Sequence, residues 1–153
     1  MESPFTIQLA LSFEKKGKLL IVEDSADARR AIAAYFSTQG YEVLEASKGK
    51  DALDTIRRNR DVDVVLLDLF IPEIGGLELL TEIQICPERP GVILLTGLAD
   101  REVAHDALRL GAFDYILKPV NLHELESSVV ACLAHREYLK QSWWKRLSLK
   151  STS

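Results

Sequence analysis

Short apolar runs alternate along this chain with longer segments of mixed polarity. Five runs rich in Val, Ile and Leu occupy residues 19–22, 41–46, 62–67, 92–95 and 113–117. Three of them are almost continuously hydrophobic, which is typical of strands buried on both faces of a parallel sheet. The pattern therefore predicts five β-strands in the interior of the molecule.

The segments between the runs carry the end signals of helices. Ser25 and Asn121 are candidate N-caps, and Gly40 and Gly111 are candidate stops. Helices are expected at residues 25–39, 48–60, 76–85, 99–110 and 121–140. The alternation of strand and helix predicts an α/β fold with a doubly wound parallel sheet. Right-handed crossovers favour a flavodoxin-like (βα)5 arrangement with strand order 2-1-3-4-5.

Residues 18–140 account for this unit, and residues 1–17 form an N-terminal extension. Pro4 and Gly17 resemble helix start and stop signals. Strict alternation of apolar positions instead reads as an extra strand, at Phe5, Ile7, Leu9, Leu11 and Phe13. Both interpretations of the extension stay open.

Residues 141–153 form a basic, tryptophan-containing tail or an extension of the last helix. Leu139, Trp143 and Leu147 recur at i, i+4 and i+8, which favours the extension. Trp143 and Trp144 would then contact a partner, a second copy or a membrane surface. The alternatives are packing against the chain's own body and the absence of fixed structure.

Composition and charge restrict the class of protein. The 153 residues are 47% hydrophobic and 27% charged, which is typical of one globular domain. Five basic residues against one acidic residue give positions 133–153 a charge of +4, so the net −4 leaves −8 on residues 1–132. Such an acidic body is not expected to bind nucleic acid directly. The two cysteines suggest reduced thiols, no membrane-spanning run or secretory leader is apparent, and we expect a cytoplasmic protein.

Acidic residues follow two of the predicted strands. Glu23 and Asp24 end strand 1, and Asp68 ends strand 3. These strands are neighbours in the expected topology, so the three carboxylates converge at the crevice where such folds bind ligands. Each acid alone would be an ordinary solvated loop residue. Together they suit Mg²⁺, which prefers carboxylate and phosphate oxygens.

Two further strand ends add a hydroxyl and a cation. Thr96 ends strand 4 and Lys118 ends strand 5, at the same edge of the sheet. Phosphoryl transfer to an aspartate requires a carboxylate nucleophile, a metal site, a hydroxyl donor and a lysine that neutralises phosphoryl oxygens.

In this combination the chain resembles the receiver domain of two-component response regulators. The resemblance covers about residues 18–140. Its matching pieces are residues 20–25, residues 66–68, Pro72, Gly76, residues 92–97 and residues 111–119. Each piece is weak alone, and their occurrence in register makes the resemblance specific.

The resemblance implies a role for each site residue. Asp68 would be the phosphoacceptor and a ligand of Mg²⁺, for which Mn²⁺ can substitute. Asp24 would bind the metal directly, Glu23 through water, and Phe70 through its backbone carbonyl. Thr96 would bond the phosphoryl group, Lys118 would pair with it, and Tyr115 would be the aromatic switch residue that turns inward on activation.

The chain departs from the family at a few positions. Ile71 stands where Met is frequent, and Glu23 replaces Asp in the first acidic position. Phe70 and Leu98 occupy positions that tune phosphoryl lifetime in the family. Both are apolar and cannot orient an attacking water, so we expect a long-lived aspartyl phosphate.

The function expected is that of a single-domain response regulator. It would take a phosphoryl group from a histidine kinase or phosphotransfer protein. It would then signal to an unknown downstream protein through its fourth helix, fifth strand and fifth helix. Formation of a homodimer is also expected as a possible partner interaction. It would be a kinase substrate that assists its own phosphorylation and dephosphorylates slowly, rather than a turnover enzyme. The alternative is the receiver fragment of a larger transcriptional regulator. A dehalogenase-like phosphatase would need a second Asp where Phe70 stands.

Overall fold

The structure, a computed structural model, describes residues 16–87 and 89–151. The competing interpretations of the N-terminal extension therefore fall mostly outside the described residues. The strands are β1 (Lys18–Val22), β2 (Glu42–Ala46), β3 (Val64–Asp68), β4 (Gly91–Thr96) and β5 (Asp114–Leu117). The helices are α2 (Ala26–Thr38), α3 (Gly49–Arg58), α4 (Gly76–Gln84), the 3₁₀ turn η1 (Leu98–Asp100), α5 (Arg101–Arg109) and α6 (Leu122–Ser151).

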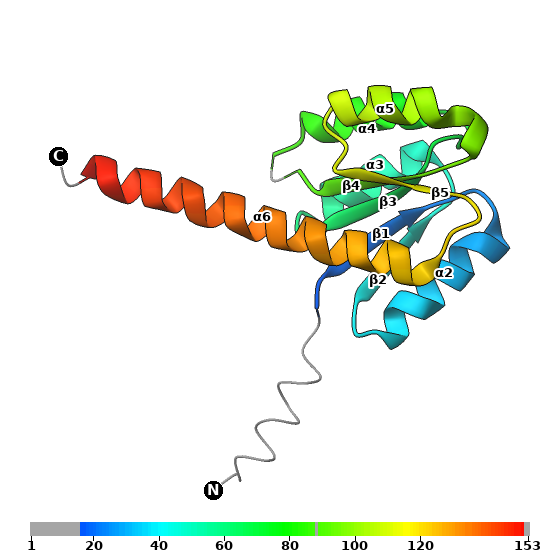
Figure 1. Ribbon diagram of the computed structural model, residues 1–153, viewed down its shortest axis with the longest axis horizontal. Helices are drawn as coiled ribbons and strands as arrows, with labels where there is room; N and C mark the ends of the chain where they lie inside the picture. The colour runs from blue at the N-terminus through cyan, green and yellow to red at the C-terminus, as the bar shows by residue number, and fades with distance from the viewer. Residues whose placement is uncertain (1–15, 88, 152–153) are drawn as a thin grey trace, which may run out of the picture.

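All strand pairs are parallel, and the sheet order is β2-β1-β3-β4-β5 (Figure 1). This confirms the predicted fold class and strand order. The predicted strand limits differ from the observed ones by one or two residues. The register aligns Val22 of β1 with Leu67 of β3, so that the residues that follow both strands emerge side by side.

Alternate residues of each strand enter two separate cores. Leu19, Ile21 and Leu66 lie in the core that α2 and α6 cover, together with Phe36 and Val129 from those helices. The intervening residues of the same strands pack with α3, α4 and α5 on the opposite face. The nearly continuous apolar runs follow from this arrangement, because both faces of the sheet are buried.

Helix ends are set by the residues that the sequence singled out. The Ser25 hydroxyl accepts a bond from the Ala28 amide at 3.4 Å, and Asn121 Oδ1 accepts one from the Glu124 amide at 3.0 Å. Gly40 and Gly111 adopt φ angles of 94° and 109°, which favour glycine at a helix stop. The helix expected over residues 99–110 is shorter in the structure. Its first residues form the 3₁₀ turn η1, and the α-helix α5 spans Arg101–Arg109.

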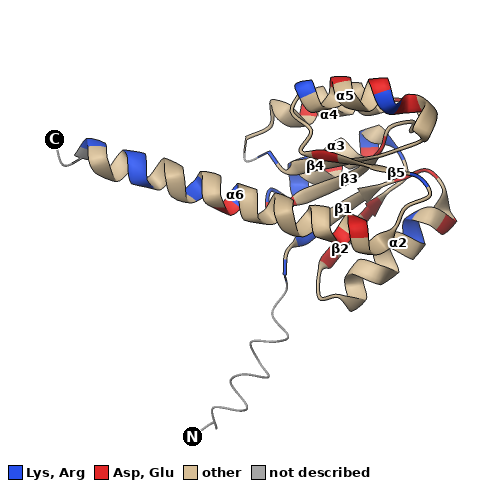
Figure 2. Ribbon diagram, viewed as in Figure 1, with Lys and Arg blue, Asp and Glu red and all other residues tan. Residues whose placement is uncertain are grey.

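The last helix is longer than residues 121–140. Helix α6 continues to Ser151, because no Gly or Pro interrupts it and its apolar stripe extends through Leu139, Trp143 and Leu147. Its outer half projects from the body and carries the basic residues (Figure 2). Within residues 16–87 and 89–151, no helix combines the length and apolar character needed to cross a bilayer.

The loop after β3 lies very close to the start of α4, where Gly76 contacts the backbone of Leu69. A Cβ on Gly76 would lie 2.5 Å from the carbonyl oxygen of Leu69 and 2.9 Å from its Cα. Gly76→Ala must therefore displace the loop beside Asp68, and we expect a loss of about 1–3 kcal/mol in the free energy of unfolding, measured by urea denaturation.

Gly75→Ala is the matched control. A Cβ there meets nothing within 4 Å and the backbone φ is −63°, so the loss should stay below about 1 kcal/mol. Equal effects of the two substitutions would contradict the steric explanation.

Candidate functional site

The site lies at the carboxyl edge of the sheet, where β1 and β3 end next to each other. Glu23 and Asp24 follow β1 directly, and Asp68 is the last residue of β3. One carboxylate oxygen from each of the three lies within 4.8 Å of the others. Glu23 and Asp68 are buried, whereas Asp24 is exposed. The fold thus brings together the three acids that the sequence predicted to converge.

Lys118 supplies the positive charge beside these acids. Its Nζ lies 3.3 Å from Asp68 Oδ1 and 3.6 Å from Glu23 Oε1. The lysine follows β5, and its backbone amide donates to the Thr96 carbonyl at 2.7 Å, which ties it to the end of β4. One lysine thus neutralises part of the charge of two buried carboxylates.

Glu23 carries the strongest electrostatic perturbation of the site. Its side chain is 5% exposed, and its Oε2 has no hydrogen-bond partner among the described residues. Burial, reinforced by the neighbouring Asp68 carboxyl, raises the pKa of Glu23 to about 8, although Lys118 acts in the opposite direction. A buried oxygen without a partner, next to two further carboxylates, fits a site built to receive a cation.

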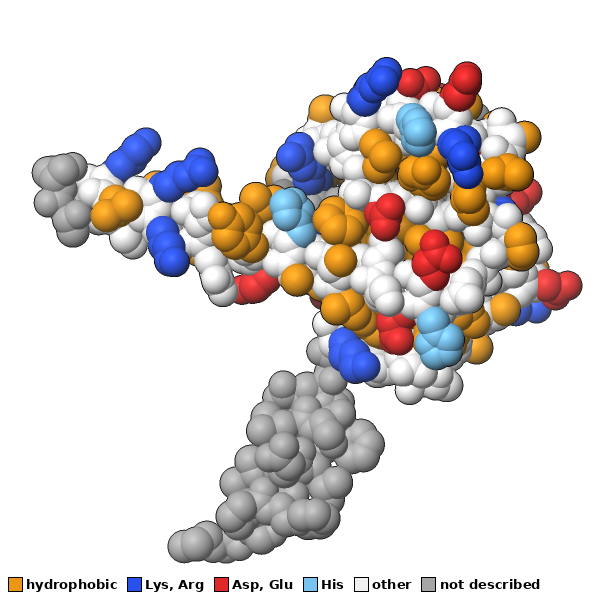
Figure 3. All heavy atoms as spheres, in the orientation of Figure 1, with side chains coloured by type: hydrophobic (Ala, Val, Ile, Leu, Met, Phe, Trp, Pro, Cys, Tyr) orange, Lys and Arg blue, Asp and Glu red, His pale blue; other side chains and the backbone are white. Residues whose placement is uncertain are grey.

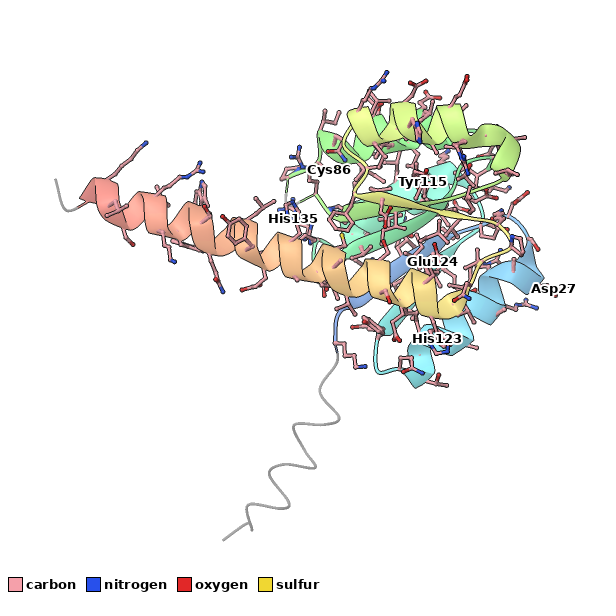
Figure 4. All side chains as sticks on the ribbon, viewed as in Figure 1. Asp27, Cys86, Tyr115, His123, Glu124 and His135 are labelled. Atoms are coloured by element: carbon pink, nitrogen blue, oxygen red, sulfur yellow. The ribbon has the colours of Figure 1, made fainter. Side chains whose placement is uncertain are left out.

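Thr96 and Tyr115 lie on neighbouring strands. Thr96 is buried at the end of β4, and its hydroxyl lies 3.4 Å from the Gly97 carbonyl oxygen. Tyr115 lies on β5 beside α5 (Figure 4), and its hydroxyl is 3.3 Å from Nε2 of His105. The described conformation therefore holds the tyrosine hydroxyl at α5.

Phe70 and Leu98 flank the acids from the two adjacent loops. Their side chains are 61% and 67% exposed. The Phe70 amide donates to Asp68 Oδ1 at 3.2 Å, which helps to orient that carboxylate. Two exposed apolar residues thus follow the strand ends that carry Asp68 and Thr96.

One residue that positions the site, Arg29, was not predicted from the sequence. Arg29, in the first turns of α2, donates from Nη1 to the Glu23 carbonyl at 2.8 Å and from Nε to Glu45 at 3.2 Å. It fastens the backbone between the two acids to α2 and β2. The only sequence signal was a basic residue in the helix that follows the acidic pair.

Comparison with known proteins places these features in a family. The family model described as the response regulator receiver domain matches residues 19–130. Regulatory protein AtoC of Escherichia coli (strain K12) is 39% identical over 124 residues, which are 81% of this chain and 27% of that protein. Sporulation initiation phosphotransferase F of Bacillus subtilis (strain 168) is 32% identical over 112 residues, 73% of this chain and 90% of that protein.

Solved structures agree with the sequence comparison. A response regulator receiver domain protein from Clostridium thermocellum superimposes with a TM-score of 0.77 at 31% identity, over 80% of this chain and 98% of that one. The chain spans about half or less of the length of the first curated relatives that it matches. The range that the family model matches, residues 19–130, includes Glu23, Asp24, Asp68, Thr96 and Lys118. This chain therefore belongs to the response regulator receiver domain family.

Proposed function

We propose that Asp68 accepts a phosphoryl group and that this event switches the protein. The observation that carries the proposal is the placement of Lys118 Nζ 3.3 Å from Asp68 Oδ1, within a cluster of three carboxylates. A buried carboxylate with an adjacent cation can act as a nucleophile while the cation offsets charge on the incoming group.

The donor in this proposal is a phosphohistidine of a histidine kinase or phosphotransfer protein. An oxygen of Asp68 attacks phosphorus, a P–O bond forms, the P–N bond breaks, and the imidazole leaves with its bonding electron pair and takes up a proton. Lys118 then pairs with a phosphoryl oxygen, and the Thr96 hydroxyl donates to another. Receiver domains are phosphoacceptor switches rather than classical enzymes, and the chain would assist only its own phosphorylation.

Glu23, Asp24 and Asp68 would hold a divalent cation, with the backbone carbonyl of Phe70 as a further ligand. Hard carboxylate oxygens suit Mg²⁺, and Mn²⁺ can substitute for it. When bound, the cation supplies charge neutralisation for the phosphoryl oxygens. Glu23 and Asp24 would orient it from the residues that follow β1, and Asp68 would do so from the end of β3.

The output surface of the proposal consists of α5, β5 and α6. Phosphorylation draws Thr96 toward the phosphoryl group, and Tyr115 leaves His105 and turns inward, so that α5 and β5 present a different surface. The recipients are an unknown downstream protein or a second copy of the chain. A protein with this function would act in the cytoplasm, and this chain would not bind nucleic acid directly. As the alternative, the same receiver would control the output domain of a larger transcriptional regulator.

Phosphorylation tests the proposal directly. Incubation with acetyl phosphate and Mg²⁺ should add one phosphoryl group per chain, measured by intact mass spectrometry. Asp68→Asn should show no gain, because an amide oxygen is not the required nucleophile, and omission of Mg²⁺ should prevent the gain in the unmodified chain. No mass gain in the unmodified chain with Mg²⁺ would refute the function.

The apolar border of the site predicts a slow loss of the phosphoryl group. With Mg²⁺ the aspartyl phosphate should decay over minutes or longer, because neither Phe70 nor Leu98 can orient water. Leu98→Gln should shorten the half-life about tenfold or more, since a polar side chain can position a nucleophilic water. Ile85→Gln, at another exposed position, is the matched control. A half-life of seconds in the unmodified chain would contradict the prediction.

The raised pKa of Glu23 predicts a pH dependence without metal. The folded protein binds a proton between the ordinary value of 4.5 and about 8, where the unfolded chain does not. The free energy of unfolding should therefore fall as pH rises through this window, by a few kcal/mol as an order of magnitude. Glu23→Gln should remove most of the slope, measured by denaturation between these pH values.

Binding of Mg²⁺ should oppose the protonation of Glu23. Because cation binding favours the deprotonated carboxylate, Mg²⁺ affinity should increase with pH up to about 8 and should flatten this slope in the unmodified chain. A slope that Glu23→Gln leaves unchanged would show that another group titrates.

A further inference from the structure

A second concave surface lies at the edge of the sheet opposite the acidic site. This groove of about 1140 Å³ runs between α6 and the loops that precede β3 and β4. Helix α6 contributes Leu139, Trp143 and Trp144 to one wall, and the loops contribute Val62 and Cys86 to the other. None of these residues takes part in the proposed phosphorylation.

The α6 wall of the groove continues a face that is buried elsewhere. Leu125, Val129 and Cys132 of α6 pack against the sheet with almost no exposure. At helical spacing the same face continues through Leu139 and Trp143, past the end of the sheet. The two indoles, which pack edge to face at 5.1 Å, are 57% and 63% exposed. Figure 3 shows apolar and basic side chains together on this projecting half of α6. Exposed apolar side chains gathered in a groove mark an interaction site.

Basic side chains stand on both walls of the groove. Arg60 and Arg89 belong to the loops, and Arg136 and Lys140 belong to α6. The guanidinium groups of Arg89 and Arg136 donate to the main-chain carbonyls of Gln84 and Arg89, and these bonds leave the positive charges unbalanced. Among the described residues, none of the four basic side chains has an ion-pair partner.

The two acidic residues of the lining already have partners within the chain. Lys18 Nζ lies 3.1 Å from Asp61 Oδ1, and the Lys18 amide donates to Asp63 Oδ2 at 2.8 Å. Four basic residues against two acidic ones leave the lining with a net charge of +2, and Lys18 offsets part of the acidic share. The lining therefore attracts a ligand of negative charge.

A second copy of α6 does not complement this face. In a parallel pair of helices, Arg136 and Lys150 share the heptad position of Trp143, so each cation would lie against its counterpart. Like charges placed opposite each other oppose association.

A broad anionic surface also fits less well than a narrow one. A bilayer would contact the projecting half of α6 but would leave Arg60 and Arg89, across the groove, without partners. A nucleic acid is densely charged, and the net −8 of residues 1–132 would repel it. A peptide chain can enter the groove, place carboxylates beside both walls and cover the indoles with apolar side chains.

We propose that this groove binds a segment of a partner protein that is acidic and carries apolar side chains on one face. The apolar side chains pack against Leu139, Trp143 and Trp144, and the carboxylates pair with the basic residues of the two walls. A helix with apolar residues at three- and four-residue intervals among Glu and Asp has this character. The proposal does not rest on the phosphorylation of Asp68, because the groove lies at the other edge of the sheet.

Both tryptophans of the chain line the groove, so their fluorescence reports on its occupation. The probe is a synthetic peptide of about 15 residues with Leu at i, i+3, i+4 and i+7 spacing and Glu between them. We expect saturable binding at micromolar concentrations, with a blue shift of the emission as the indoles leave water. A peptide with the same Leu pattern and Lys in place of Glu should show no saturable binding, because its charge matches that of the walls.

Substitutions on the two walls locate the binding. Lys140→Glu should weaken peptide binding about tenfold, and Arg60→Glu, on the opposite wall, should have a similar effect. Lys145→Glu is the matched control, because Lys145 belongs to the same helix but does not line the groove. It should change the affinity less than about two-fold.

The midpoint of urea denaturation should be the same in the unmodified chain and the three variants, which verifies that all of them fold. Absence of phosphorylation by acetyl phosphate in these proteins would count against the proposed function alone, since peptide binding is measured without it.

Four results would overturn the proposal. The first is that the acidic peptide does not bind or binds no better than the Lys-containing peptide. The second is that Lys145→Glu weakens binding as much as Lys140→Glu. The third is that anionic phospholipid vesicles or a single-stranded oligonucleotide bind at lower concentrations than the peptide, which would identify a different partner. The fourth is the formation of dimers in light scattering that exclude the peptide, which would identify a second copy as the occupant.

Discussion

Two carboxyl groups, those of Glu23 and Asp68, are buried next to each other at the end of the central strands, and the chemistry of the protein depends on how their charge is balanced. Water cannot balance it, because both side chains are more than nine-tenths buried. Lys118 balances part of it from β5, and protonation of Glu23 balances more, as its raised pKa indicates. A divalent cation would complete the balance and would also offset the negative charge of an incoming phosphoryl group. The site is thus held in a state that favours ligands of the proposed kind.

The parallel sheet stabilises the fold enough to tolerate these buried charges. Its two cores bury nearly all of the central strand residues, and the loops at the carboxyl edge are fastened by specific contacts, such as Arg29 to the Glu23 carbonyl and Gly76 to the Leu69 carbonyl. Tyr115 packs partly against one core and places its hydroxyl 3.3 Å from Nε2 of the exposed His105 on α5. The proposed switch residue therefore lies between the core and the surface.

The two edges of the sheet differ in physical character. The carboxyl edge carries the acidic site, and it lies within the residues that the receiver-domain model matches. The amino edge carries a basic, aromatic helix and a groove, and the receiver relationship, which covers residues 19–130, does not reach that helix half.

Much of this protein was determined by local sequence. Continuous apolar runs, caps at Ser25 and Asn121 and stops at Gly40 and Gly111 specified the elements. Their alternation indicated a doubly wound parallel sheet, for which right-handed crossovers favoured the order 2-1-3-4-5. That order alone placed Glu23, Asp24, Asp68, Thr96 and Lys118 at one edge. Only the tertiary structure decided the protonation tendency of Glu23, the contacts of Arg29 and His105 and the groove beside Trp143. Each of these depends on how different helices, strands and loops pack against one another. That packing sets the burial and the distances on which Coulomb energies depend, and no local pattern encodes it.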